Sequence, residues 1–208
     1  LGEDRPEDIV AEVMAFDLRL NGDLLTHDDS ANTDIIAVAE RRRGLSGALS
    51  IFYLHAAAKV GLVVRPVDFP NHALLRIETT EGPIAMDPFA QGRVVMPSEL
   101  RERALRAGLT PHVADRLDVL MAPISPRQAL IRLQSLQFSR ALSAEDYPAA
   151  ERSAMRRAWL EPDNHRPWLD VASAREKQGA LTGALQALAQ ARQVSGEDWV
   201  VQPRQMDR

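Results

Sequence analysis

The sequence contains no cysteine among its 208 residues. This absence excludes disulfide bonds, thiolate metal sites and a thiol nucleophile. An excess of positive charge is also missing, because 25 Lys and Arg stand against 29 Asp and Glu and give a formal net charge of −4. Without a broad positive field to attract phosphate backbones, nucleic acid is not an expected partner.

Long apolar runs are missing as well. A helix that spans a bilayer needs about 20 apolar residues, and His55 and Lys59 interrupt the apolar stretch that follows Ser50. The five histidines show no metal-binding spacing, and no glycine-rich phosphate loop occurs. We therefore expect no membrane anchor, no metal and no other cofactor, and a cytoplasmic location. Because the sequence begins at Leu1 rather than methionine, an N-terminal segment that has been removed stays an open alternative.

The remaining composition is that of an ordinary globular protein, 45% hydrophobic and long enough for one good-sized domain or two small ones. Apolar residues between positions 6 and 20 recur at helical spacing and predict a first helix, which Asn21 and Gly22 end. The run TDIIAVAERRR predicts a second, short helix. We interpret its arginines, residues 41–43, as a solvated helix end, where cations suit the helix dipole, rather than as a phosphate or partner patch.

The central feature is the stretch SGALSIFYLHAAAKVGL, residues 46–62. Up to position 60, the only clearly polar side chains after Ser46 are Ser50, His55 and Lys59, and the length predicts a helix that is buried on nearly every side. The pattern then changes to short β-branched and apolar runs, LVVRPVDF, HALLRIETT and PIAMDPF. These runs predict two or three antiparallel strands packed on that helix, and PSELRERALRAG predicts the next helix.

Strand signals vanish after residue 124, and helices are expected at about residues 126–142, 144–160, 165–179 and 181–194. Ala150 and Ala154 recur 34 residues later as Ala184 and Leu188, and Trp168 lies where a tetratricopeptide repeat has an aromatic residue. This pattern resembles one full repeat preceded by half a repeat. The alternative is an ordinary helical hairpin with alanines at its close crossings. We predict two domains, an α+β domain over residues 1–124 and a helical tail over residues 125–208 that docks on it.

Three residues are candidates for chemistry: Ser46 starts the buried helix, His72 opens a strand and Asp87 closes the next strand. Adjacent antiparallel strands can bring His72 beside Asp87 and leave the histidine facing the helix start. This is the arrangement of a nucleophile, a base and an orienting carboxylate. A structural interpretation is open for each residue and is the one we favour. A histidine held by a carboxylate satisfies two buried polar groups, and serine is a favoured helix N-cap, worth about 1 kcal/mol.

The runs SGALSIFYLHAAAKVGL, FPNHALLRI and IAMDPFAQG resemble the transglutaminase-like core of bacterial proteins of the SirB type, in which tetratricopeptide-like helices follow that core. The resemblance covers residues 31–95 and extends more loosely through the tail. It implies an α+β fold with a papain/transglutaminase-like core, in which a buried central helix packs against a small antiparallel sheet. In catalytic members of that superfamily a cysteine begins the central helix, and here Ser46 holds that position. His72 and Asp87 match the other two positions, and Asn71 replaces the usual glycine before the histidine.

Serine in place of cysteine decides the functional expectation. A helix N-terminus and a neighbouring histidine can lower the pKa of a thiol from about 8.5 to about 3.5–7.5, whereas a serine reacts only if His72 takes its proton during attack. We therefore expect a noncatalytic protein with a degenerate triad of Ser46, His72 and Asp87, which acts as a scaffold and binds a protein partner through its helical tail. One alternative is a hydrolase of amide or ester bonds that uses the same three residues. Another is an oligomeric structural component whose tail mediates self-association.

Overall fold

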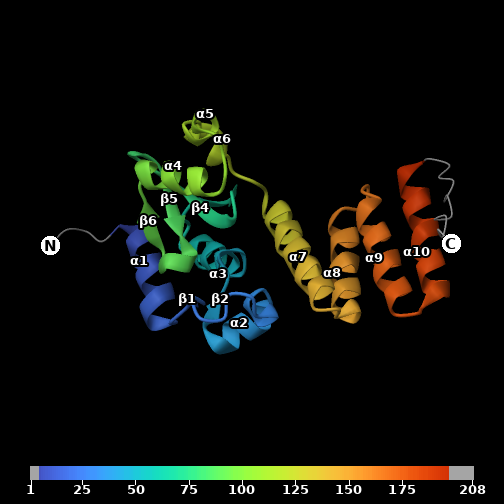
Figure 1. Cartoon of the computed structure of the whole chain (residues 1–208). Coiled ribbons are helices and arrows are strands. Elements are labelled where there is room, and N and C mark those ends of the chain that lie inside the picture. The colour runs from blue at the N-terminus through green and yellow to red at the C-terminus, as the bar shows by residue number, and fades with distance from the viewer. Residues whose placement is uncertain (1–4, 197–208) are drawn as a thin grey trace. The chain divides into compact units, whose positions relative to one another are not determined.

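The computed structural model describes residues 5–196, and the chain divides into two compact units, Leu1–Leu133 (unit 1) and Gln134–Arg208 (unit 2). Among the described residues, all strands lie in unit 1, and unit 2 is helical (Figure 1). The sequence predicts a boundary after residue 124, but α7 (Pro126–Ser143) begins within unit 1. The boundary falls later because Leu133 of α7 is buried in the core of unit 1.

The first helix is shorter than predicted. Helix α1 (Pro6–Glu12) passes directly into a π-helix, η1 (Val13–Asp17), in which Leu18 N donates to Val13 O at 2.9 Å. The prediction of one regular helix over residues 6–20 is therefore wrong in its second half. An i→i+5 bond widens the turn, and the apolar spacing alone does not distinguish it from an α-helix.

The segment after η1 forms two very short strands rather than a simple stop. Strand β1 (Asn21–Gly22) pairs in parallel with β2 (Arg43–Gly44). Between them lie a 3-10 helix, η2 (Ser30–Asn32), and α2 (Ile35–Arg41), which confirms the predicted second helix. These strands were missed because two residues are too few for a period-2 pattern to show.

The arginines at residues 41–43 are all exposed at the end of α2, which agrees with a solvated helix end. Arg41 also makes two ion pairs within unit 1. Its guanidinium pairs with Asp23 at 3.2 Å and with Asp29 at 3.1 Å, so it ties the loop between β1 and η2 to α2. Arg42 ends α2 in the left-handed conformation, with φ of 60°. No sequence pattern indicates these pairs, because the partners of Arg41 lie in a polar connector without regular spacing.

Unit 1 is built on a four-stranded antiparallel sheet in the order β3-β4-β5-β6. Three of the strands match the three predicted runs, and the fourth, β6, has only three residues, too few to be recognised from an alternating pattern. Neighbouring residues of β4 point to opposite faces of the sheet, so Leu74 and Leu75 enter two different hydrophobic clusters. The bounds are β3 Val64–Phe69, β4 His72–Thr79, β5 Gly82–Asp87 and β6 Arg93–Val95.

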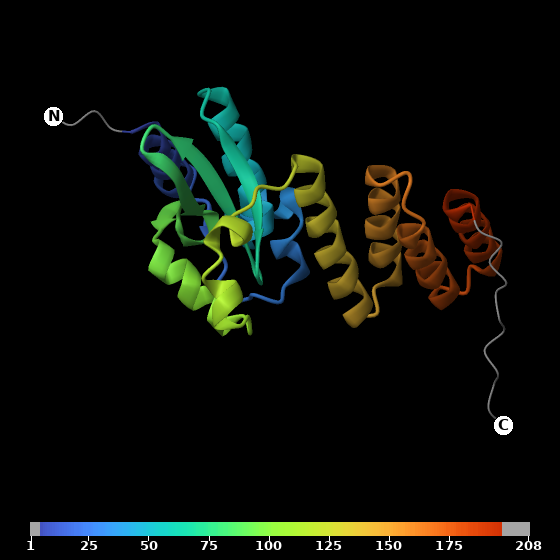
Figure 2. The same ribbon diagram turned by 90° about the horizontal axis from the view of Figure 1, so that it is seen from above.

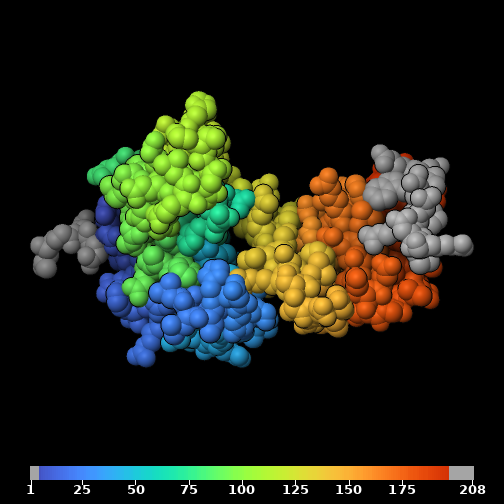
Figure 3. Space-filling model, in the orientation of Figure 1, coloured from blue at the N-terminus to red at the C-terminus, as the bar shows by residue number. Residues whose placement is uncertain are grey.

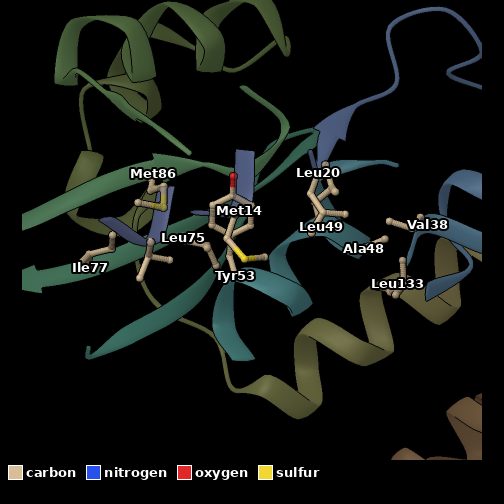
Figure 4. Close-up of a cluster of buried hydrophobic side chains, with 11 residues drawn as sticks. Met14, Leu20, Val38, Ala48, Leu49, Tyr53, Leu75, Ile77, Met86 and Leu133 are labelled. Carbon is tan, nitrogen blue, oxygen red and sulfur yellow. The ribbon is translucent and has the colours of Figure 1, made fainter. Parts of the chain in front are cut away.

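Helices cover both faces of this sheet. On one face lie α1 and α3 (Ser46–Lys59), the predicted central helix, which runs alongside β3 and β4 (Figure 2). Tyr53 of α3 packs there in one cluster with Met14 and Leu75 (Figure 4). Helix α3 is buried or half-buried except at His55 and in its last turn. On the other face lie α4 (Pro97–Arg106), α5 (Pro111–Ala114) and α6 (Leu117–Leu120), whose side chains form the upper part of unit 1 in Figure 3.

Unit 2 consists of the end of α7 and of α8 (Tyr147–Leu160), α9 (Arg166–Lys177) and α10 (Leu181–Ser195). The predicted helices are present, with α8 beginning later than expected because Asp146 caps it by accepting from Ala149 N. Consecutive helices pack on each other through alanines, which let their backbones approach closely. The alanines at 150, 154, 184, 187 and 191 are all buried. Across the part of the chain that the structure describes, no helix combines the length and apolar character needed to cross a membrane.

Candidate functional site

His72 and Asp87 meet at one end of the sheet. His72 is the first residue of β4 and Asp87 is the last residue of β5, and the antiparallel pairing of these strands places both residues at the same edge. His72 Nε2 lies 2.8 Å from Asp87 Oδ1. The two strand-borne residues singled out from the sequence are therefore in direct contact, and the other ring nitrogen of His72 is left to face away from the carboxylate.

The Asp87 carboxylate is buried, with 2% of its surface exposed, and several groups donate to it. Besides His72, Arg103 Nη1 donates to Oδ2 at 2.7 Å, and the backbone N–H of Phe89 donates to Oδ1 at 3.0 Å. Burial by itself raises the pKa of Asp87, but the hydrogen bonds and charges of His72 and Arg103 outweigh it, so the pKa lies below its ordinary value. Asp87 therefore stays ionised in the folded protein near neutral pH.

Arg103 is a member of the site that sequence reasoning missed. It extends from α4 and also donates to Glu99 Oε1 at 2.7 Å, while Arg93 donates to both oxygens of Glu99. The hydrogen bonds from Arg93 and Arg103 lower the pKa of Glu99 to about 2. Helical spacing was an available signal, because Arg103 lies on the same face of α4 as the buried Leu100.

Ser46 takes a structural hydrogen bond at the start of α3. Its Oγ accepts from the backbone N–H of Ala73, the residue after His72, at 3.1 Å. Ser46 is 8% exposed. Within residues 5–196, no hydrogen bond joins Ser46 to His72. The sequence therefore located the serine beside the strand that carries the histidine, but it did not reveal which group its hydroxyl contacts.

The prediction that Ser46 caps α3 is wrong. The N-cap is Leu45, with an extended backbone at φ −81° and ψ 159°, and among the described residues no side chain makes a capping hydrogen bond to α3. Ser46 is already the first helical residue, so its hydroxyl is not placed to accept from the N–H groups of its own first turn. It points to β4 instead, where Ala73 supplies the donor.

Phe89 holds the imidazole from a second side. Its ring meets the His72 ring edge-on, with centroids 5.8 Å apart and planes at 80°. The Phe89 ring also lies against β1, where a Cβ atom on Gly22 would come within 2.5 Å of it. Glycine at this position is therefore required for the close packing that keeps Phe89 against His72.

An open pocket of about 450 Å³ adjoins these groups. His72, Asp87 and Arg103 form part of its wall, whereas Ser46 is not among the lining residues. The remaining wall residues come from the β3–β4 turn, from η3 (Pro88–Ala90) and from α4. They are Phe69, Pro70, Asn71, Phe89, Ala90, Glu99, Arg106 and Ala107.

Below the site, the hydroxyl of Tyr53 is fully buried and, within the described residues, has no hydrogen-bond partner. Burial, followed by the charge of Asp87, raises the pKa of Tyr53 above its ordinary value. Tyr53 therefore remains neutral and contributes no charge to the site. In the same described part of the chain, no group of three or more His, Asp and Glu side chains is arranged to hold a metal ion.

Comparison with protein families gives one match that covers most of unit 1. The family model of the transglutaminase-like superfamily matches residues 3–135. This stretch contains the four-stranded sheet, the central helix α3 and all of the residues of the candidate site. A search of solved structures gives no significant match.

Relatives of similar sequence are found in bacteria and in mammals. Two proteins named UPF0162 protein, from Xylella fastidiosa strains Temecula1 and 9a5c, are each 31% identical over 166 and 158 residues, or 77% and 75% of this chain. The aligned regions make up 57% and 56% of those relatives, so the chain spans a little over half of their length. F-box only protein 21 of Mus musculus is 29% identical over 100 residues, which are 44% of this chain and 16% of that protein. Since the family model covers well over half of the sequence, the chain belongs to the transglutaminase-like superfamily.

Proposed function

We propose that this protein is a noncatalytic member of the superfamily, which acts as a scaffold that binds a protein partner. One observation carries the proposal: the hydroxyl at the position of the missing thiol accepts a hydrogen bond from Ala73 N–H and makes none to His72. A serine nucleophile needs its proton directed to the base before attack. Here the hydroxyl joins α3 to β4 instead, and no cysteine is present to replace it.

The charge around His72 also supports a noncatalytic role. In a working triad the carboxylate stabilises the imidazolium that forms when the histidine takes a proton. In this site Arg103 lies 2.7 Å from Asp87 and compensates the negative charge. Less of the carboxylate's field is then available to an imidazolium, so proton transfer from a serine is disfavoured.

Unit 2 is the proposed surface for the protein partner. Its helices contain buried alanines, and Ala150 recurs 34 residues later as Ala184, a spacing that resembles a tetratricopeptide repeat. Some large apolar side chains of unit 2 pack in its core, as Trp168 does, and others lie on its surface. Trp159 is 68% exposed and Leu185 is 67% exposed. Exposed aromatic and aliphatic side chains of this kind are frequent anchors in protein interfaces.

A hydrolase of amide or ester bonds is the second candidate. The 2.8 Å contact between His72 and Asp87 favours it, because an oriented histidine beside a serine is the minimum that such chemistry needs. Rotation of the Ser46 side chain away from Ala73 would have to supply the missing contact to His72.

Labelling with a fluorophosphonate separates the two candidates. The intact protein is incubated with the reagent and its mass is measured, beside a Ser46→Ala variant. We expect no adduct on either protein. An adduct that is present on the wild type and absent from the variant would establish the hydrolase and overturn the noncatalytic proposal.

The partner surface is tested with matched substitutions in the full chain. Trp159→Ala removes an exposed side chain of unit 2, and Met96→Ala removes one that is 59% exposed in unit 1. Proteins cross-linked to the wild type should be lost with the first variant and kept with the second. Equal capture by both variants would mean that the surface around Trp159 does not bind the partner.

A further inference from the structure

The pocket beside His72 offers few free acceptors to a ligand. Asp87 accepts hydrogen bonds from His72, Arg103 and backbone N–H groups. Glu99 accepts hydrogen bonds from two guanidinium groups. Both carboxylates are thus paired and their charges compensated. A cationic ligand would have to displace an arginine from one of them.

Donors, in contrast, remain available. Arg103 uses three of the five N–H groups of a guanidinium, one to Asp87 and two to Glu99. Arg106, one turn further along α4, is exposed, and over residues 5–196 its guanidinium has no hydrogen-bond or ion-pair partner. Asn71, also exposed on the pocket wall, adds an amide that no described residue occupies. The free groups of the pocket therefore favour an anion.

The rest of the wall is apolar. Pro70, Phe89, Ala90 and Ala107 line the pocket together with the polar groups. Its volume of about 450 Å³ lies within the range of about 300–1,000 Å³ that is usual for small-ligand sites. The walls can hold an apolar side chain while the arginines hold a charged group next to it.

We propose that this pocket binds a carboxylate carried by an apolar residue, namely the C-terminal carboxylate of a peptide or protein that ends in such a residue. A carboxylate matches the planar guanidinium of Arg106 in a two-point hydrogen-bonded pair. An α-carboxylate and an apolar side chain on one residue occupy the arginine side and the apolar walls together. A Glu side chain carries the charge without the apolar group and fills only part of the pocket. The inference rests on the proposed noncatalytic function, since it treats the site as one that holds a ligand without converting it.

The test is a titration of the ¹⁵N-labelled full chain, followed by ¹H–¹⁵N NMR. The probes are N-acetyl-phenylalanine, its neutral primary amide, and the α-amide of N-acetyl-glutamic acid. The free acid should shift the amide signals of Asn71, His72 and Ala107, and it should bind at least about tenfold more tightly than either other probe, which corresponds to about 1.4 kcal/mol.

Arg106→Gln should abolish the preference for the free acid over the amide. Arg65→Gln is the matched control, because Arg65 is exposed in unit 1 and does not line the pocket. It should leave the preference unchanged. Because both arginines are exposed, both variants should fold, and their ¹H–¹⁵N spectra without ligand should remain close to that of the wild type.

Three results would overturn the inference: equal binding of acid and amide, equal binding of the glutamate probe, or a preference that survives Arg106→Gln. Failure of the proposed function is seen separately. A fluorophosphonate adduct on Ser46 would make the protein an enzyme whatever the titration shows, whereas a failed titration leaves the labelling result intact.

Discussion

Two loops of unit 1 each contain a buried aspartate that pairs with an arginine, and only one of these loops forms a candidate site. Asp23 and Asp87 are each 2% exposed, and each pairs with one arginine, Arg41 at 3.2 Å and Arg103 at 2.7 Å. Both also accept backbone N–H groups from the residues that follow them. The difference is that Asp87 has a histidine as a further partner and a pocket beside it, whereas Asp23 contacts the side chain of Thr26 in its own loop.

The comparison teaches that a buried aspartate–arginine pair is not by itself evidence of function in this chain. The hydrogen bonds from Thr26 lower the pKa of Asp23, as His72 and Arg103 lower that of Asp87. A lowered pKa of the aspartate therefore does not distinguish the two loops. The loop of Asp87 is distinguished by His72, which is partly exposed to the pocket.

Asp87→Ala should have the largest effect of the substitutions considered. It leaves Arg103 and His72 without their buried acceptor and should lower the free energy of unfolding by about 3–5 kcal/mol, measured by urea denaturation at pH 7. Since the pKa of Asp87 is lowered in the folded protein, its stabilisation is full above the ordinary carboxyl pKa, about 3.9, and declines as the pH falls below it. The difference between wild type and variant should therefore shrink in acid.

Asp118→Ala is the control for this substitution. Asp118 pairs with Arg116 on the exposed surface at 3.0 Å, so its removal should leave stability nearly unchanged. An equal loss in the two variants would mean that burial of the Asp87 pair contributes nothing.

Asp23→Ala should have a smaller effect, because the freed donors lie in a loop at the surface and can turn to water. It removes four hydrogen bonds, including the one from Arg41. The melting temperature should fall less than in Asp87→Ala, and limited proteolysis should begin at Leu24 and Leu25, which are 82% and 83% exposed. A melting temperature as low as that of Asp87→Ala would contradict the distinction between the two loops.

Of the three substitutions that remove a buried polar group, Ser46→Ala should have the smallest effect on stability. It removes the acceptor for Ala73 N–H, and the cost should be about 1 kcal/mol in urea denaturation. Ser98→Ala, at an exposed position of α4, serves as the control and should cost less. If Ser46→Ala is as stable as the wild type, the hydrogen bond to Ala73 does not hold the serine in place.

The sequence was sufficient for the parts of this fold that repeat a long pattern. The central helix, three strands and the helices of unit 2 follow from periodicity, and the positions of His72 and Asp87 at strand ends brought them into one hypothesis. The short strands β1, β2 and β6 carry too few residues for a pattern. Helix η1 differs from an α-helix in its hydrogen bonds and in its wider turn, and the apolar spacing of its residues does not show this difference.

The contacts within the site were harder to predict from the sequence than the identity of its residues. Three arginines occur on α4, and only the face shared with Leu100 indicates that Arg103, rather than Arg101, turns inward. For Ser46, a one-residue difference in the helix start decides whether the hydroxyl caps its own helix or reaches Ala73. Helix ends are uncertain by that amount in any pattern-based prediction.

The most direct test of the degenerate site restores the missing thiol. If Ser46 holds the nucleophile position of a transglutaminase-like site, the thiol of Ser46→Cys should form a thiolate through the N-terminus of α3 and His72. The pH profile of its alkylation by iodoacetamide should then have a midpoint below about 7.5. Ser98→Cys lies at another helix start but has no histidine beside it, so its midpoint should lie between that value and the free-thiol value of about 8.5. Adding His72→Ala should raise the first midpoint toward the second. A Ser46→Cys thiol that titrates like the Ser98→Cys control would contradict the account that this is a transglutaminase-like site that has lost only its thiol, because even a thiol at position 46 would then have no coupling to His72.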